Sequence, residues 1–318
     1  MASASTSKST PLYAWFSLLL PPLLWAGNFV AGRAVRDDLT PMTLSLGRWV
    51  IALLFLLPFA FKAMRRDWRR YWEHRWMVLG TSSMGIAAYN SLLYCSLQTT
   101  TASNALLLNS LAPLMIVLLG AVFYRQRLNW NQGTALILSF IGVLILVFQG
   151  NWSHWQSISL NAGDVIVLVA AACWAVYTLW LRQLPADLDR LGLMGAQIAL
   201  ALFILLPLTI LEHRTATVPE LGVKAYAALV YVGVFASALA YFLYMRAVQH
   251  FGPARAGLCV HLAPVFGVAL SAVFLGEQLH LYHALGIGTI AVGLVFSGRG
   301  TGAQRTPNTA PRAYKQAI

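Results

Sequence analysis

Long apolar runs separated by short polar segments follow one another along almost the whole chain. Each run is about 20 residues long, which is the length that an α-helix needs to cross the hydrocarbon core of a bilayer. The pattern predicts ten membrane-spanning helices with short connections and no soluble domain. The expected spans are 12–33, 42–62, 76–97, 103–124, 131–149, 163–182, 191–211, 224–246, 255–275 and 281–298. The first run is too long for the core of a signal peptide, so we interpret it as an uncleaved span.

Composition supports an all-α integral membrane protein. Of the 318 residues, 58% are hydrophobic and only 10% are charged, whereas a soluble domain carries about 25% charged residues. The net charge of +12 raises the question of nucleic-acid binding. However, the basic residues lie in short stretches between apolar runs, which is typical of topology signals and not of a contiguous phosphate-binding face. We therefore expect membrane lipid, and no nucleic acid, around this chain.

The distribution of lysine and arginine predicts the orientation. With the N-terminus in the cytoplasm, 17 of the 22 basic residues lie on the cytoplasmic side and four lie outside, while Arg48 lies within a span. Positively charged loops stay in the cytoplasm. We therefore expect a multi-pass protein of a bacterial inner membrane with both termini cytoplasmic.

The second half of the sequence repeats the first. The segment LAPLMIVLLGAVFYRQRL at 111–128 parallels LAPVFGVALSAVFLGEQL at 262–279, which pairs Pro113 with Pro264. Five spans in each copy are an odd number of crossings, so the second copy is inverted relative to the first. Inverted repeats are the architecture of many secondary transporters, with the substrate site near the midplane between the halves. The expected division is a tail at 1–11, a first repeat at 12–149, a linker at 150–162, a second repeat at 163–298 and a tail at 299–318.

Several motifs, in this order and in duplicate, resemble the EamA family of the drug/metabolite transporter (DMT) superfamily. They are LLWAGNFVAGR at 23–33, TPMTLSLGRW at 40–49, GDVIVLVAAACWAVY at 163–177, AVFLGEQL at 272–279 and GIGTIAVGLVF at 286–296. The resemblance extends from about residue 12 to residue 298. It implies ten helices around a central cavity and a substrate range centred on amino acids and other small metabolites, usually exported. The family often has a glutamate after the fourth helix of each repeat; Glu277 stands there in the second copy, but Gln126 does so in the first, which puts a symmetric carboxylate role in doubt.

A few polar groups inside the expected spans are candidates for transport. Ionisable groups in a span are costly and usually face a cavity or a partner. Arg48, with Asn28 at similar depth, is suited to binding a substrate carboxylate; the alternative is a structural arginine that bonds helix-end carbonyls or reaches the membrane interface. His261 is suited to relaying a coupling proton or binding substrate, or is structural. Pro113 and Pro264 remove backbone hydrogen bonds and are candidate hinges.

Aromatic and amide side chains recur at spacings of three to five residues, which places them on shared helix faces. One alternative is helix packing together with aromatic belts at the membrane interfaces. Belt residues cluster at the ends of spans, whereas several of these lie well inside, so we interpret them as lining a substrate cavity. The candidates are Trp25, Asn28, Tyr89, Asn90, Tyr94, Asn109, Trp174, Tyr177, Tyr241 and Tyr244.

The sequence contains no Walker motif, no HExxH and no paired carboxylates within a span. Cys95, Cys173 and Cys259 lie in apolar runs without a CxxC pair, so we interpret them as buried thiols. We expect no cofactor, no metal and no enzymatic activity. The predicted function is a secondary active or facilitative transporter that exports small amphiphilic metabolites, such as amino acids, by alternating access, as a monomer or homodimer. Proton exchange and facilitated flow both fit these residues; the alternatives are an importer or exchanger of another metabolite, a membrane-embedded enzyme and a non-transporting subunit.

Overall fold

The computed structural model describes residues 12–125, single positions between 130 and 145, and residues 161–185, 187–215, 221–251 and 262–301. Within these residues all regular secondary structure is helical, which confirms the predicted all-α class. Six helical stretches among the described residues are long and apolar enough to cross a membrane, and two of them, Ala102–Tyr124 and Val223–Tyr244, are made of consecutive shorter elements. The expected span at 131–149 lies largely outside the described residues.

The helices of the first half follow the expected spans, with two spans divided into shorter pieces. They are α1 (Leu12–Ala34), α2 (Pro41–Glu73), α3 (Arg75–Thr81), the π-helix η1 (Ser82–Ala88), α4 (Tyr89–Ser96), α5 (Ala102–Asn109) and α6 (Ala112–Tyr124).

The second half has a similar order of elements. They are α8 (Ala162–Leu181), α9 (Arg190–Thr215), α10 (Val223–Val230), the π-helix η3 (Tyr231–Leu239), α11 (Ala240–Phe251), α13 (Ala263–Leu275) and α14 (Leu281–Thr301).

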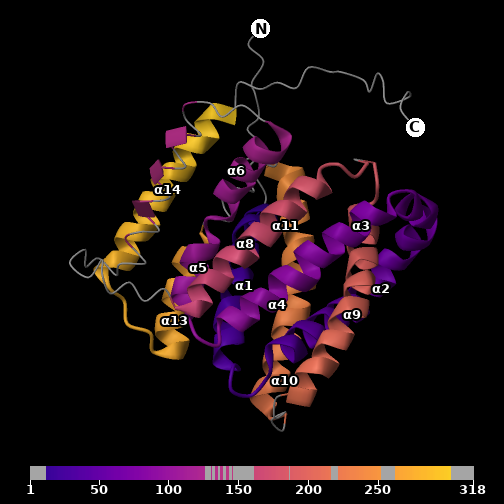
Figure 1. Ribbon diagram of the computed structural model, residues 1–318, viewed down its shortest axis with the longest axis horizontal. Coiled ribbons are helices and arrows are strands. Elements are labelled where there is room, and N and C mark those ends of the chain that lie inside the picture. Colours follow the sequence, from indigo (N-terminus) through magenta and orange to yellow (C-terminus); the bar gives the residue numbers. More distant parts are fainter. Residues whose placement is uncertain are drawn as a thin grey trace.

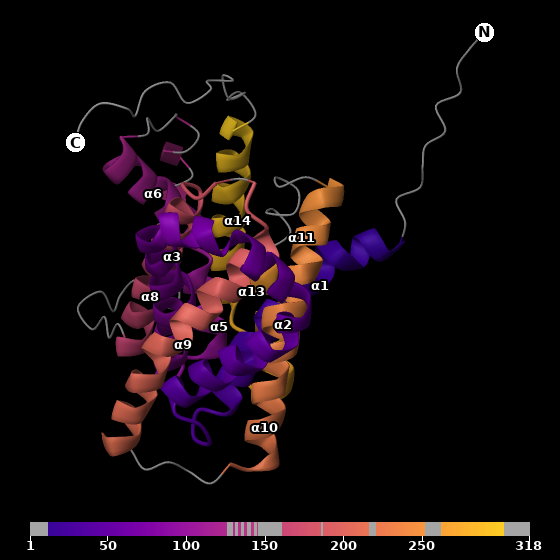
Figure 2. The ribbon, with the colours of Figure 1, turned by 90° about the vertical axis from the view of Figure 1, so that its right-hand side faces the viewer.

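These helices form one bundle in which elements of the two halves interleave (Figures 1 and 2). The helix α2 packs along α9, while α1 packs against α11 and α13. In Figure 1 α14 lies at one edge of the bundle and the α2–α9 pair lies toward the other. Each half is therefore buried against the other, and neither forms a separate domain.

Helix α2 continues past the expected end of its span at residue 62 as far as Glu73. Hydropathy marks the part that crosses hydrocarbon, whereas the helix ends only where its sequence allows, and no glycine or proline follows Pro58 before Glu73. The polar end of α2 binds the segment before α9. Arg70 donates two hydrogen bonds to the Asp187 carboxylate, each 2.8 Å long, and this interaction lowers the pKa of Asp187 because it stabilises the charged form.

The sequence repeat is visible in the backbone. Helices α6 and α13 each have 13 residues, and each is followed by a left-handed residue, Arg125 with φ 50° and Gly276 with φ 66°. Both expected hinge prolines, Pro113 and Pro264, lie in the first turn of these helices and not inside them. A first-turn residue has no intrahelical acceptor for its N–H, so proline is tolerated there without loss of a helical hydrogen bond.

Candidate functional site

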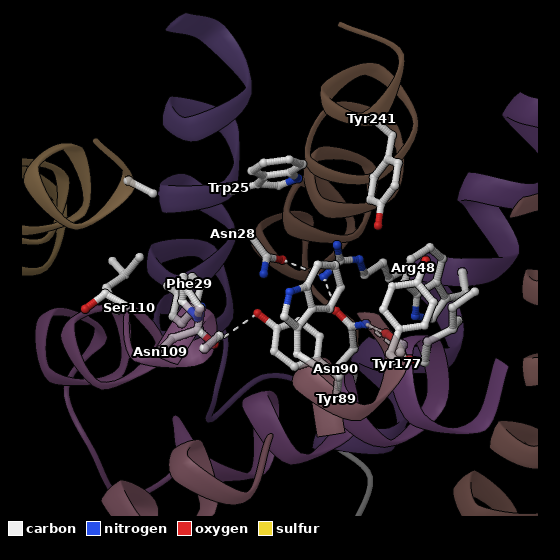
Figure 3. Close-up of a pocket in the computed structure, with 18 of the residues that line it drawn as sticks. Trp25, Asn28, Phe29, Arg48, Tyr89, Asn90, Asn109, Ser110, Tyr177 and Tyr241 are labelled. Atoms are coloured by element: carbon white, nitrogen blue, oxygen red, sulfur yellow. Dashed lines mark hydrogen bonds between the residues drawn. The ribbon is translucent and has the colours of Figure 1, made fainter. Parts of the chain in front are cut away.

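A cavity of about 180 Å³ lies between helices of both halves. Figure 3 shows Trp25 on α1 and Tyr241 on α11 on one side, with Tyr89, Asn90 and Arg48 facing them. Nine predicted site residues line this cavity: Trp25, Asn28, Arg48, Tyr89, Asn90, Asn109, Trp174, Tyr177 and Tyr241. Spans far apart in the sequence therefore bring these side chains to one place.

Arg48 is the centre of the polar part of the cavity and only 5% of it is exposed. Its Nε donates to Ser237 Oγ at 2.7 Å. Its Nη1 donates to Asn90 Oδ1 at 2.7 Å, to the Tyr94 hydroxyl at 3.0 Å and to Asn28 Oδ1 at 3.1 Å. The Tyr94 hydroxyl in turn donates to Asn28 Oδ1 at 2.7 Å. The guanidinium is thus held by side chains of three helical segments, α1, α4 and η3, and not by helix-end carbonyls as in the structural alternative.

No carboxylate offsets the charge of Arg48 among the described residues. The ion pairs there involve other basic residues, and the cavity lining contains no aspartate or glutamate. Removing a charge from water costs several kcal/mol, which neutral acceptors offset only in part. The cavity therefore presents one positive charge that a ligand anion would complement.

Two π-helical segments, one in each half, position two of the four acceptors of Arg48. Asn90 directly follows the start of α4 after η1, and its Nδ2 donates to the carbonyl oxygens of Gly85 and Ile86 at 3.3 and 3.1 Å. Ser237 lies in η3 and donates to the Val232 carbonyl oxygen, five residues earlier, at 2.7 Å. The wider turn of a π-helix leaves carbonyls available to side chains, and such segments are frequent at functional sites.

Aromatic rings form the walls of the cavity. The Tyr89 and Trp174 ring centroids lie 5.0 Å apart, and those of Trp174 and Tyr177 lie 5.1 Å apart. Trp25 and Tyr241 meet edge to face at 6.0 Å. Such contacts hold rings in fixed orientations and leave their flat faces to contact an apolar ligand.

The remaining predicted residues lie close to the cavity or outside the described residues. Tyr94 is 1% exposed and lies behind the lining, where it binds Arg48. Tyr244 contacts the Trp25 ring at 5.5 Å and does not line the cavity. His261 falls outside the residues that the structure describes.

The two first-turn prolines also line the cavity. In the first half the helical structure is interrupted at Ser110 and Leu111, between α5 and α6 and close to Pro113. Asn109 ends α5 and accepts a hydrogen bond of 3.2 Å from the Tyr89 hydroxyl. The role of Pro113 and Pro264 as hinges stays a prediction.

Gln197 is a cavity residue that we did not predict. It is 2% exposed and its Nε2 donates to Thr81 Oγ1 at 2.7 Å. The internal repeat could have indicated this residue. The triplet LLP ends at Pro58 in the first copy and at Pro207 in the second, which is an offset of 149 positions. The same offset pairs Arg48 with Gln197. Ser237 was also missed, since one serine in an apolar span carries little signal.

Glu277 caps a helix of the other half. Its Oε1 accepts from the backbone N–H of Ala102 at 3.0 Å and its Oε2 from that of Ser103 at 3.2 Å. A carboxylate at a helix N-terminus satisfies free N–H groups and complements the helix dipole. Gln126, at the matching position of the first copy, lies outside the described residues.

Comparison with known proteins agrees with this architecture. The model of the EamA-like transporter family matches residues 12–148 and 161–299. A probable terminal-alkyne amino-acid exporter of Streptantibioticus cattleyicolor is 30% identical over 268 residues, which cover 83% of this chain and 86% of the relative. An uncharacterized transporter of Archaeoglobus fulgidus is 26% identical over 280 residues, which cover 88% of this chain and 94% of the relative. A solved protein structure with 18% sequence identity superposes with a TM-score of 0.61. The match covers 93% of this chain and 100% of the other chain, which supports the fold. The chain belongs to the EamA-like transporter family.

Proposed function

We propose that this transporter exports amino acids or related small amphiphilic carboxylates across the bacterial inner membrane. The observation that carries the proposal is Arg48, a buried cation without a carboxylate partner among the described residues, in a cavity walled by aromatic rings. The cation complements a carboxylate, and the rings complement an apolar side chain.

Alternating access is the mechanism that this arrangement favours. Both halves contribute to the cavity lining, and the repeated sequence is consistent with two inverted copies that expose one site to either side in turn. Arg48 binds side chains of both halves, Ser237 from the second and Asn90 from the first. A relative movement of the halves therefore changes the surroundings of the binding group.

Export, and amino acids as cargo, rest on similarity. The relative from Streptantibioticus cattleyicolor is named a probable exporter of an amino acid. The distribution of basic residues supports cytoplasmic chain ends, because positively charged loops stay in the cytoplasm.

The test is flux in proteoliposomes, with cargo chosen by comparing the metabolites of a deletion strain and an overexpressing strain. Wild-type protein should give saturable flux, and Arg48→Gln should remove most of it. Arg36→Gln is the matched control, because Arg36 pairs with the exposed Asp37 and does not line the cavity. Full flux in Arg48→Gln would exclude this cavity as the route. An imposed pH gradient that drives flux would identify proton exchange, and indifference to it would identify facilitated flow.

A further inference from the structure

We infer that the cavity selects its cargo by net charge and prefers an aromatic monocarboxylate without a free ammonium group to the zwitterionic amino acid. Arylalkanoic acids and N-acylated aromatic amino acids belong to this class. The inference rests on the proposed function, since it concerns the cargo of the same cavity.

Charge is the first reason. Arg48 is the one charged side chain among the described residues that line the cavity. A zwitterion brings an ammonium group only a few bonds from its carboxylate, so the repulsion between ammonium and guanidinium cancels much of the carboxylate's attraction. A monoanion keeps the full attraction, and an amine without a carboxylate is repelled.

Free hydrogen-bond donors are the second reason. The Nη2 nitrogen of Arg48 has no acceptor in the described part of the chain. The adjacent Trp49 lines the same cavity, is 3% exposed, and its indole Nε1 is buried without a hydrogen-bond partner there. The Arg48 Cζ atom lies 4.9 Å from the centroid of the Trp49 ring, so the two side chains are in contact. An unsatisfied buried donor favours a ligand that brings acceptors.

The amide oxygens around Arg48 and Tyr89, in contrast, each already accept a hydrogen bond. Asn28 Oδ1 accepts from both Arg48 and Tyr94, and Asn90 Oδ1 accepts from Arg48. Asn109 Oδ1 accepts from Tyr89. An ammonium group next to Arg48 would have to compete for these oxygens or rest on an aromatic face. The surroundings of Arg48 therefore favour a ligand group that brings acceptors over one that brings donors.

The test compares three ligands that share one phenyl ring: N-acetylphenylalanine, phenylalanine and phenethylamine. Binding is measured by tryptophan fluorescence of the purified protein in detergent, and flux by proteoliposomes. We expect N-acetylphenylalanine to bind at least about tenfold more tightly than phenylalanine, and phenethylamine to compete with neither. Arg48→Gln should abolish this ranking, whereas Arg48→Lys, which keeps the charge, should retain it.

A second variant separates the donor from the charge. Trp49→Phe keeps an aromatic ring and removes the indole N–H, so affinity for N-acetylphenylalanine should fall about threefold to tenfold. Trp68→Phe is the matched control, because Trp68 is 60% exposed and lies outside the cavity.

The outcomes separate this inference from the proposed function. Phenylalanine that is transported and binds as tightly as its N-acetyl derivative would overturn the inference and leave the proposed function standing. Binding of phenethylamine with an affinity similar to that of N-acetylphenylalanine would also overturn the inference and leave the proposed function standing. If none of the three ligands binds or is transported, the inference and the assignment of aromatic carboxylates as cargo both fall.

Discussion

The two repeats carry different side chains at one matching position of the cavity, Arg48 in the first copy and Gln197 in the second. Gln197 is a neutral amide that donates to Thr81 within the wall. Arg48 is a cation that reaches acceptors on segments of both halves. Duplication thus supplies a nearly symmetric scaffold, while the chemistry of the cavity depends on where the copies differ.

Making the two positions alike should have the largest effect. Arg48→Gln removes the only charge of the described lining, and we expect flux of a carboxylate cargo to fall about 100-fold or more, because a buried charge-assisted contact is lost. Gln197→Leu, the matched change in the other copy, should reduce flux far less. Initial rates in proteoliposomes measure both, and equal losses in the two variants would contradict the distinction.

Exchanging the two side chains should not repair the loss. In Arg48→Gln combined with Gln197→Arg the cation lies beside Thr81, away from Asn28, Asn90 and Ser237, which surround position 48. We expect flux to stay at the level of the single Arg48→Gln variant. Recovery to half of the wild-type rate would show that the position of the charge does not matter.

Removing one of the hydrogen-bond acceptors that surround Arg48 should have an intermediate effect. Tyr94→Phe removes an acceptor of Arg48 and a donor to Asn28, so the guanidinium is held less firmly, and we expect about a tenfold loss in kcat/KM. Tyr226→Phe is the control, because Tyr226 is 55% exposed. Normal membrane insertion together with an unchanged kcat/KM in Tyr94→Phe would argue against a role for these acceptors in positioning Arg48.

A smaller effect is expected at the other asymmetric position. Glu277→Gln makes the second copy resemble the first, where Gln126 stands, and weakens the cap on α5. We expect the free energy of unfolding to fall by about 0.5–1.5 kcal/mol, seen as a lower Tm in detergent. Glu73→Gln on the exposed end of α2 is the control. An equal fall of Tm in both variants would show that the cap on α5 contributes no specific stability.

The smallest effect concerns the ends of α6 and α13. Arg125 has a positive φ of 50° where the second copy has Gly276. A side chain is strained there, so Arg125→Gly should raise stability by about 0.5–1 kcal/mol. Arg125→Ala keeps the strain and should give no such gain. A lower Tm for Arg125→Gly than for Arg125→Ala would contradict this explanation.

Hydropathy predicted the helical class and the approximate spans within the described residues, and the polar, aromatic and proline positions inside those spans predicted about half of the cavity lining. These features depend on the bilayer and on helix periodicity, which a sequence records directly. The π-helical segments were not predicted, because both lie inside spans whose hydropathy indicates only a membrane helix. Gln197 was missed because its depth in the bundle becomes evident only when the LLP triplets are aligned. Tyr244 and Tyr94 share a helix face with lining residues, but the packing of the neighbouring helices decides which side chains reach the cavity surface.

The most direct test of the account is a structure of the protein with N-acetylphenylalanine bound. We expect a carboxylate oxygen within hydrogen-bonding distance, about 2.7–2.9 Å, of Arg48 Nη2, with the phenyl ring between the aromatic walls. A ligand whose carboxylate lies away from Arg48, or a ligand bound outside this cavity, would contradict it.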